Sequence, residues 1–352
     1  MLAQKKQNRS KPLLDALNGH VAEQIPFWYM RQAGRYLPEY MDLRQTAGSF
    51  LDLCYNPDFA TKVTLQPLQR FDMDAAILFS DILVIPQALG QELTFVQGEG
   101  PKLPPINSLA QIEKLTLENS IEKLNPILKT VQQVSKELAE DKTLIGFSGA
   151  PWTVATYMVE GGSSRDFIKI KKLMYQQPQA FEKLLTKIVD ATVLYLCAQI
   201  KSGADALQIF DSWSGVLDSG SFDRWVIQPT QEIVRRVKDV YPETPIIGFP
   251  KGAGSLYPAY FKETGVDAVS LDSNLCPKWA AENLQPLGCV QGNLDPVSLL
   301  IGGQQMLDRA GFILENLSSG PFIFNLGHGI IKETPTEHVA ELSKFIKNFK
   351  KT

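Results

Sequence analysis

Two arginines on one short loop are the first residues of this chain whose types and spacing suggest chemistry. The stretch Arg31-Gln32-Ala33-Gly34-Arg35 follows an aromatic and apolar run at 27–30, which is typical of a buried strand. Pro38 suits the first position of a helix, so residues 31–37 are predicted to form a strand-to-helix loop. Guanidinium groups bind carboxylates and phosphates because they donate in a plane and stay charged. The loop therefore predicts either an anion-binding site or ion pairs with acids on neighbouring loops.

Single polar or aromatic side chains follow four other apolar, strand-like runs. These residues are Asp81, Tyr157, Ser212 and His328. An acid in such a place is either a functional group or a helix cap, and a tyrosine there either packs in the core or contacts a ligand. The histidine stands between two glycines, which give it nothing to pack against, so it serves either a ligand or the turn backbone. The residues alone leave both interpretations open at each position.

Eight short apolar runs alternate with amphipathic helical patterns along the chain. The expected strands are apolar on both faces, as buried parallel strands should be, and lie at 27–31, 75–80, 144–148, 206–210, 245–249, 268–271, 289–291 and 322–325. The expected helices are 58–71, 121–139, 178–202, 222–240, 304–315 and 336–349. This alternation predicts an α/β fold, a (β/α)₈ TIM-type barrel, with a doubly wound sheet as the alternative. Residues 90–105 interrupt it and predict a small hairpin inserted after the second strand.

No linker or change of composition divides the chain. Residues 11–352 are therefore expected to form a single barrel domain, preceded by a flexible polar tail at residues 1–10. In such a barrel the functional residues lie on loops at the carboxyl ends of the strands. The five places named above are thus expected to meet at one end of the barrel.

The composition excludes several classes of partner. No apolar run reaches transmembrane length, and a net charge of −3 without a basic stripe argues against nucleic acid. Four cysteines have no spacing suited to zinc or to a disulfide framework, so a reducing cytoplasm fits best: Cys54, Cys197, Cys276 and Cys289. We therefore expect a cytoplasmic protein with no membrane segment and no metal. An anionic substrate would have to be attracted by a local arginine cluster.

The run from Met30 to Tyr40, with its Arg-Gln-Ala-Gly-Arg core, closely resembles the N-terminal signature of the uroporphyrinogen decarboxylase family. Further segments at 79–83, 155–162 and 327–330 also match this family, and the likeness extends along nearly the whole chain. The resemblance implies that Asp81 is the central catalytic residue. It also implies a set of substrate-binding residues: Arg31, Gln32, Ala33, Gly34, Arg35, Asp81, Tyr157, Ser212 and His328.

The resemblance implies a reaction as well. Four acetate side chains of uroporphyrinogen III would become methyl groups, giving coproporphyrinogen III in heme and chlorophyll biosynthesis. Relatives work without a cofactor and form homodimers, so a cofactor-free carboxy-lyase and a homodimer are expected here. Protonation of a pyrrole would make a cationic ring that accepts the electron pair left by CO₂, and Asp81 would offset that charge. Arg44 is a weaker candidate for a carboxylate contact, or only a helix-surface charge.

Three other functions can be set beside this one. A Ser-His-Asp hydrolase would need a nucleophile elbow, which Ser212 lacks. A zinc-dependent, corrinoid-linked methyltransferase on a related barrel would need His-x-Cys after a strand, yet the comparable strand end reads Gly248-Phe249-Pro250-Lys251-Gly252. A non-catalytic tetrapyrrole-binding protein would keep the arginines but have no need of Asp81. The last two functions remain as alternatives.

Overall fold

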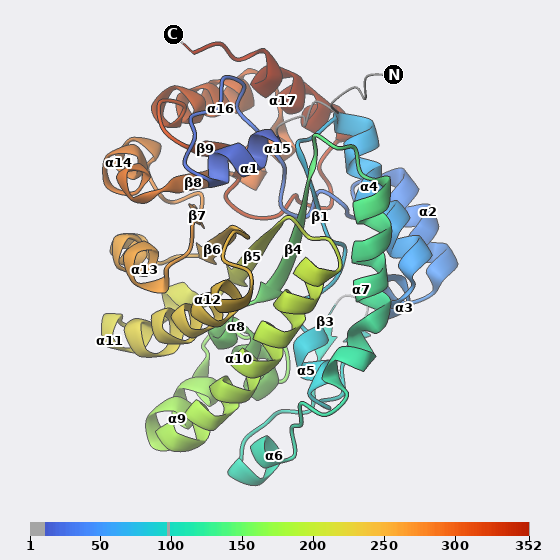
Figure 1. Cartoon of the computed structure of the whole chain (residues 1–352), viewed down its shortest axis with the longest axis vertical. Helices are drawn as coiled ribbons and strands as arrows, with labels where there is room; N and C mark the ends of the chain where they lie inside the picture. Colours follow the sequence, from blue (N-terminus) through green and yellow to red (C-terminus); the bar gives the residue numbers. More distant parts are fainter. Residues whose placement is uncertain (1–10, 97–98, 352) are drawn as a thin grey trace, which may run out of the picture.

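Seven parallel strands form the main sheet, in the order β1-β4-β5-β6-β7-β8-β9 (Figure 1). The computed structural model describes residues 11–96 and 99–351, so the tail predicted at residues 1–10 lies outside the described residues. The strands are, in the order of the sheet, Ala75–Ile77, Thr143–Gly149, Ala206–Asp211, Ile246–Pro250, Ala268–Ser270, Cys289–Leu294 and Phe322–Leu326. Each strand pairs with the next main-sheet strand along the chain through a helical crossover, as repeated βα units require.

The first predicted strand, 27–31, is reduced to a single bridge residue. Phe27 bridges to Phe324 of β9, and the Phe324 amide donates to the Pro26 carbonyl at 2.9 Å. On the other side, the Asp74 amide donates to the Phe27 carbonyl at 2.9 Å, and the Asp74 carboxylate accepts from the Phe27 amide at 2.9 Å. A side chain thus takes the place of a backbone partner. The extended conformation ends at Arg31, whose φ is positive.

The sheet curls around an inner core that includes both of its edge strands. Every strand of the sheet contributes to this core, β6 with two side chains, and Trp28 and Met30 also belong to it. The strand members are Ala75, Ile145, Ala206, Ile247, Phe249, Ala268, Cys289 and Ile323. A polar network also lies in the interior, where the Gln291 amide donates to Gln208 at 3.1 Å and Trp28 donates to Gln291 at 2.8 Å. Gln208 lies on β5 and Gln291 on β8, so only a strongly curved sheet brings these two side chains into contact.

Helix α1 (Pro12–Leu17) closes the amino-terminal end of this curled sheet. Leu13, Ala16 and Leu17 are buried in the same inner core, most of whose strand members lie near the starts of their strands. Lys11, just before the helix, pairs at 2.7 Å with Asp205, just before β5. Because this end is plugged, a ligand would approach the interior from the carboxyl ends of the strands.

Long helices cover the outer face of the sheet (Figure 1). The six predicted helices are confirmed as α4, α7, α10, α12, α16 and α17: Pro57–Phe71, Ser120–Glu137, Pro178–Lys201, Gln228–Val240, Gly303–Leu317 and Thr336–Asn348. The stretch expected as one helix at 222–240 begins instead with α11 (Ser219–Phe222) and a π-helical turn, Asp223–Ile227, before α12. The helix predicted to begin at Pro38 is α2 (Pro38–Ala47).

Shorter helices were not predicted, because each has too few turns for a clear hydrophobic period. They are α3, α5, α6, α8, α9, α13, α14 and α15: Phe50–Tyr55, Val84–Ala88, Leu109–Glu113, Pro151–Glu160, Ile168–Gln176, Tyr257–Thr264, Pro277–Asn283 and Pro296–Ile301. Several of them directly follow a strand of the main sheet. Two of them bear on predicted site residues, because α5 follows the loop of Asp81 and α8 carries Tyr157.

Two further strands pair outside the main sheet, in the stretch expected to hold a hairpin. β2 (Thr94–Val96) runs antiparallel to β3 (Gly100–Lys102), and the residues between them, 97–98, lie outside the described residues. The Leu103 amide donates to the Gly161 carbonyl at the end of α8, at 3.1 Å. Leu103 also belongs to a small apolar cluster against which Tyr157 packs. This antiparallel pair therefore lies beside the carboxyl end of the main sheet.

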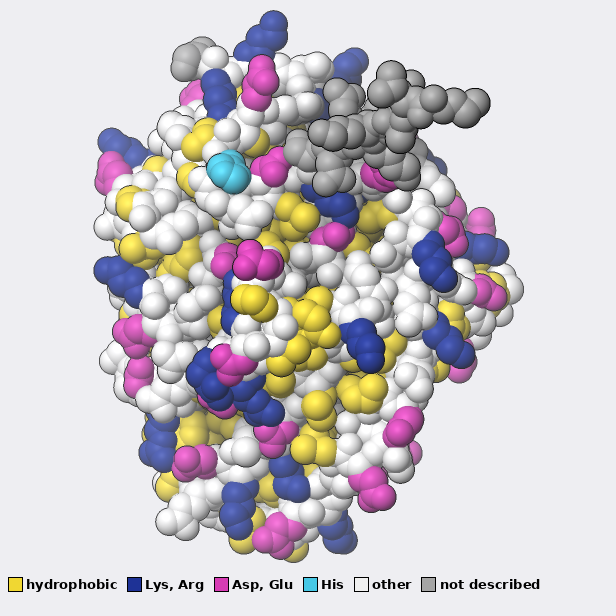
Figure 2. Space-filling view, viewed as in Figure 1, with side chains coloured by type: hydrophobic (Ala, Val, Ile, Leu, Met, Phe, Trp, Pro, Cys, Tyr) yellow, Lys and Arg dark blue, Asp and Glu magenta, His cyan; other side chains and the backbone are white. Residues whose placement is uncertain are grey.

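Figure 2 shows acidic and basic side chains interspersed over one face of the molecule, with hydrophobic side chains between them. No single-sign stripe is visible on that face, in keeping with the net charge of −3. Within residues 11–96 and 99–351, no helix combines the length and the apolar character needed to cross a membrane.

Candidate active site

The loop at 31–37 keeps its shape because one of its polar side chains is turned into the core. The Gln32 side-chain amide donates to the Ala75 carbonyl at 3.0 Å, and its oxygen accepts from the Tyr29 amide at 3.3 Å. The Tyr36 hydroxyl donates to the Gln32 carbonyl at 2.7 Å. The side chain of Gln32, predicted to contact substrate, is thus occupied within the protein and holds the loop in place.

Arg31 and Arg35 extend from this loop without partners. Both are exposed, and neither forms a hydrogen bond or an ion pair with another described residue. The backbone amides of Ala33 and Gly34 likewise donate to no described residue. The two guanidinium groups and two backbone N–H groups of this loop are therefore free to bind anions.

Arg31 is held in a strained conformation above the loop that follows β9. Its φ is +59°, a left-handed conformation that costs an L-residue about 1 kcal/mol and is concentrated at functional sites. A Cβ atom at Gly329 would overlap the Cγ and Cδ atoms of Arg31. The Ile330 amide also donates to the Met30 carbonyl at 2.9 Å. The arginine loop and the histidine loop are thus packed together, and only glycine fits beneath the arginine.

Asp81 stands after β1 within the electrostatic reach of Arg31. One of its carboxylate oxygens accepts from the Leu83 amide at 2.8 Å, as in an Asx turn, and the other has no hydrogen-bond partner among the described residues. Burial raises the pKa of Asp81, while the Leu83 hydrogen bond and the positive charge of Arg31 lower it. One carboxylate oxygen of Asp81 therefore stabilises the local turn, and the other is available to bind a ligand.

Tyr157, on α8, shares the electrostatic field of Asp81. Burial raises the pKa of Tyr157, and the Asp81 carboxylate raises it further. The phenol therefore stays protonated at neutral pH and can donate a hydrogen bond. Its ring lies 6.2 Å from the ring of Trp213, which connects it to the loop after β5.

Ser212 is fixed by a hydrogen-bond chain that involves its two neighbours. The Thr153 hydroxyl donates to the Asp211 carboxyl group at 2.5 Å and accepts from the Trp213 amide at 3.1 Å. The Trp152 indole donates to the Trp213 carbonyl at 3.0 Å. The Ser212 hydroxyl itself is half-buried and has no partner among the described residues. It is thus an available hydroxyl on a rigid loop.

His328 is within the electrostatic reach of two positive charges and stays neutral. Burial, together with the charges of Arg31 and Lys251, lowers the pKa of His328 to about 3. Its ring lies 6.4 Å from the ring of Phe249 on β6. A neutral imidazole offers one donor and one acceptor nitrogen, so this residue can bind a ligand by hydrogen bonds at any physiological pH.

The structure brings most of the predicted site residues together. Charge interactions connect Arg31 with Asp81, Tyr157 and His328. Ser212 joins this group indirectly, because its neighbour Trp213 packs on Tyr157. The remaining predicted residues belong to the same loop as Arg31: Gln32 is buried, Ala33 packs against the core, Gly34 is half-buried and Arg35 is exposed.

Sequence reasoning missed one residue of this group, Lys251. Lys251 lies in the turn that directly follows β6, two residues after Phe249, whose ring is 6.4 Å from the ring of His328. From the sequence, the end of this strand was considered only as a possible zinc site. Because lysine is not a zinc ligand, Lys251 did not stand out there. Within the described part of the chain, no group of three or more His, Cys, Asp or Glu side chains could hold a metal ion.

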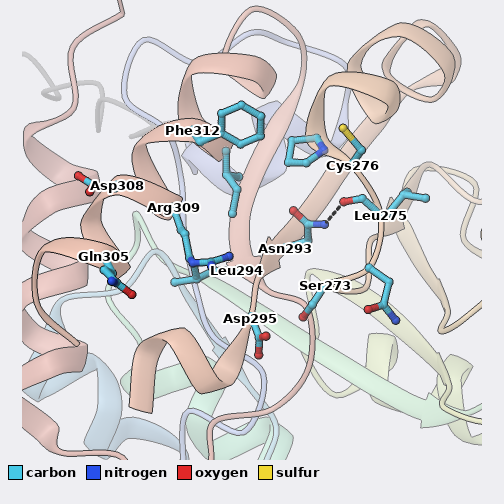
Figure 3. Close-up of a pocket in the computed structure, with 13 residues that line it drawn as sticks. Ser273, Leu275, Cys276, Asn293, Leu294, Asp295, Gln305, Asp308, Arg309 and Phe312 are labelled. Atoms are coloured by element: carbon cyan, nitrogen blue, oxygen red, sulfur yellow. Dashed lines mark hydrogen bonds between the residues drawn. The ribbon is translucent and has the colours of Figure 1, made fainter. Parts of the chain in front are cut away.

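A pocket of ≈ 610 Å³ lies between the loop after β7, the end of β8 and helix α16. Figure 3 shows Arg309 of α16 extending toward Leu294 and Asp295, while Asn293 donates to the Leu275 carbonyl at 2.8 Å. Ser273, which lines the pocket, packs against Gly327, so the pocket borders the histidine loop. None of the predicted site residues lines it.

The sequence matches known proteins over almost its full length. The family model described as uroporphyrinogen decarboxylase (URO-D) matches residues 8–349. A uroporphyrinogen decarboxylase of Rhodospirillum rubrum is 52% identical over 337 residues, which are 96% of this chain and 97% of the relative. One from Mesorhizobium japonicum is 51% identical over 340 residues, covering 97% of this chain and 98% of the relative.

The fold also resembles solved structures with more distant sequences. A methyltransferase from Methanosarcina mazei superposes with a TM-score of 0.81, covering 96% of this chain and 98% of that chain, at 19% identity. At that identity the likeness shows a shared fold alone. The family model and the relatives above half identity show more: the chain belongs to the uroporphyrinogen decarboxylase family.

Proposed function

We propose that this protein decarboxylates the four acetate side chains of uroporphyrinogen III to methyl groups, giving coproporphyrinogen III. Membership of the family supports this activity. The observation that carries it is the Asp81 carboxylate, placed with Arg31 and Tyr157 at the carboxyl end of the curled sheet. The reaction is a step of tetrapyrrole biosynthesis and needs no cofactor, because the substrate supplies its own electron sink.

Each decarboxylation is driven by a transient positive charge on one pyrrole. Protonation of the ring α-carbon gives an iminium-like cation, and the bond from the acetate methylene to its carboxylate then breaks. CO₂ leaves and the electron pair enters the ring. The exocyclic carbon takes a proton to become a methyl group, and the α-carbon returns its proton, so one proton replaces one CO₂.

Asp81 is the counter-charge of that cation, and its free oxygen also accepts hydrogen bonds from pyrrole N–H groups. Opposite unit charges about 4 Å apart interact by ~4 kcal/mol at an effective dielectric constant of about 20, enough to matter for the rate. The Leu83 hydrogen bond fixes the orientation of the carboxylate before the charge develops. This is electrostatic preorganisation.

The other residues bind and orient the macrocycle. Arg31 and Arg35 take peripheral carboxylates, assisted by the free backbone amides of the same loop. Tyr157 and Ser212 supply hydroxyl groups, from α8 and from the loop after β5. His328 supplies a neutral imidazole, so it positions the substrate and is not a cationic proton donor.

The same proposal includes a finer architecture. Residues 11–352 form a single (β/α)₈ barrel domain, in which residues 26–28 serve as the eighth strand and β2 and β3 form an inserted hairpin. Backbone hydrogen bonds from these residues to β9 and to Asp74 support the closure of the barrel. Four free cysteines support a cytoplasmic location, since a reducing compartment keeps thiols unpaired. A homodimer rests on the family resemblance, and sedimentation velocity tests it.

Anaerobic incubation with uroporphyrinogen III, followed by mass analysis of the oxidised product, tests the activity directly. Loss of four CO₂ molecules is expected, with no added metal. A product of unchanged mass would refute the proposal. If zinc co-purified and chelation removed the activity, the result would favour the zinc-dependent methyltransferase alternative.

Substitution of Asp81 tests the role of the carboxylate. Asp81→Asn keeps the shape but removes the counter-charge, so we expect a loss of at least ~3 kcal/mol, or roughly a hundredfold in rate. Asp81→Glu should retain partial activity, and both variants should still bind a planar porphyrin. Asp239→Asn, at an exposed acid on α12, is the matched control and should behave as the parent. Turnover by Asp81→Asn within a few-fold of the parent would mean that Asp81 only caps its turn.

A further inference from the structure

Lys251 lies in the turn that directly follows β6, at the carboxyl end of the strand. The Lys251 amide donates to the Phe249 carbonyl at 3.1 Å, so the extended strand ends before this residue. Phe249, two residues earlier, belongs to the inner core, and its ring lies 6.4 Å from the ring of His328. Its positive charge acts on His328, which places the side chain near the mouth of the curled sheet.

The backbone of Lys251 is held from both sides. Its amide donates to the Asp211 carbonyl at 3.0 Å, and its carbonyl accepts from the Gly215 amide at 3.1 Å. The next amide, that of Gly252, donates to the Asp272 carboxylate at 2.7 Å. Loops from the two neighbouring strands, β5 and β7, therefore fix the point from which this lysine extends.

The side chain of Lys251 has no partner of its own. It is half-buried, yet it forms no hydrogen bond or ion pair with another described residue. Other half-buried lysines are paired: Lys142 with Asp72 and Lys238 with Asp267, each at 2.8 Å. Burying an ammonium group without a counter-charge is unfavourable. A well-fixed lysine of this kind is suited to an anion that the protein does not supply.

The strand order places Lys251 across the mouth from Arg31. The segment 26–28 lies between β9 and β1, and from it β6 is the fourth strand in either direction around the sheet. His328 is within the reach of both positive charges. A single ligand that meets both cations must carry negative groups on opposite sides of a broad scaffold, as a macrocycle with peripheral carboxylates does.

We propose that Lys251 binds a peripheral carboxylate of the tetrapyrrole substrate, on the side of the mouth opposite Arg31 and Arg35. This assignment rests on the proposed function and adds a second anchoring point to it. With carboxylates held at both sides, the macrocycle cannot tilt away from Asp81. Lys251 is thus a binding and orienting residue for the decarboxylation.

Equilibrium binding of uroporphyrin III, the oxidised and planar octacarboxylate, tests the proposal at low and high salt. Lys251→Met should weaken binding roughly tenfold, the cost of one hydrogen bond to a charged group, and should reduce the salt dependence. Lys251→Arg keeps the charge and should stay within a few-fold of the parent. Lys262→Met removes an exposed lysine from α13, the helix that follows the same strand, and should change nothing.

Thermal melting of the same proteins distinguishes a loss of ligand binding from a loss of fold stability. Removing an unpaired ammonium group should leave the melting temperature unchanged or raise it, and Lys251→Gln repeats the test if the methionine variant does not fold. A folded Lys251→Met or Lys251→Gln protein that binds uroporphyrin within twofold of the parent overturns this proposal alone. A parent protein that neither binds uroporphyrin nor releases CO₂ overturns the proposed function as well.

Discussion

Three cations at the mouth of the sheet, Arg31, Arg35 and Lys251, have no acidic partner among the described residues, although acids outnumber bases in this chain by 38 to 35. Some cations elsewhere do have one, as Arg236 has Asp190 at 2.6 Å. The unpaired charges are therefore not the result of a shortage of carboxylates. They leave a local positive field for a polycarboxylate in a protein whose net charge would repel it.

The strained backbone of Arg31 leads to a prediction about stability. Glycine tolerates a φ of +59° and alanine does not, so Arg31→Gly should be more stable than Arg31→Ala by about 0.5–1 kcal/mol, the reverse of the usual order. Both variants lose the guanidinium group and should weaken porphyrin binding equally. Urea denaturation and fluorescence titration measure the two effects. Equal stability of the two variants would mean that the backbone relaxes out of the left-handed conformation.

Asp211 leads to a prediction about how the free energy of unfolding depends on pH. Burial raises its pKa to about 7, against the opposing effects of the Thr153 and Trp213 hydrogen bonds. A raised carboxyl pKa contributes stability that is full below pH 4, near the unfolded value, and is lost as pH rises through the folded value of about 7. Asp211→Asn mimics the neutral form, so it should remove this loss, which amounts to at most roughly 4 kcal/mol. Unfolding free energies of both proteins at pH 5 and pH 8 test this, and parallel pH profiles would contradict it.

The meeting of Arg31, Asp81, Tyr157 and His328 was predictable, because each follows an apolar strand and parallel strands end at one edge. The inward orientation of Gln32 was not, since an amide between two arginines looks polar and exposed until the loop folds over it. Lys251 was missed because its role is indicated by its surroundings in the fold and not by a sequence motif. Only the folded structure reveals that no acid in the described part of the chain forms an ion pair with its side chain.

At the scale of elements, the long helices and seven strands followed from hydrophobic period and alternation. The first predicted strand did not form as expected. It lies at the seam between β9 and β1, where its pairing depends on distant partners, β9 and Asp74, and not on its own apolar sequence. The loops that carry the site depend on similar long-range contacts. At Gly215, an added Cβ would stand 2.6 Å from the Gly252 carbonyl oxygen, so the loops after β5 and β6 pack backbone to backbone.

Gly215→Ala should therefore force these two loops apart. We expect a loss of about 1–3 kcal/mol in unfolding free energy, as for other overpacked sites, together with weaker porphyrin binding because Lys251 shifts with its loop. Gly220→Ala is the matched control, since a Cβ there meets only an Asp218 oxygen at 3.6 Å. Chemical denaturation and titration of both variants check this. A Gly215→Ala protein indistinguishable from the control would show that the contact opens at no cost.

At the scale of the whole molecule, the seam between β9 and β1 leads to a last prediction. Asp74→Ala leaves the buried Phe27 amide without its acceptor, which should cost about 1–3 kcal/mol of unfolding free energy. Asp74→Asn keeps an acceptor oxygen and should cost less. Binding of uroporphyrin should weaken in the alanine variant, because the seam supports the arginine loop. If both variants match the parent in denaturation, the seam does not depend on this side chain.

The bridge from Phe27 to Phe324 joins segments that a ribosome produces at nearly opposite ends of translation. Until β9 has been synthesised, the aromatic run Phe27-Trp28-Tyr29 has no strand to pair with and remains an exposed apolar segment of the nascent chain. A chain broken off before β9 would possess every arginine, aspartate and tyrosine of the site and still lack the support that orients Arg31. The support of the arginine loop is therefore completed only after nearly the whole chain has been synthesised.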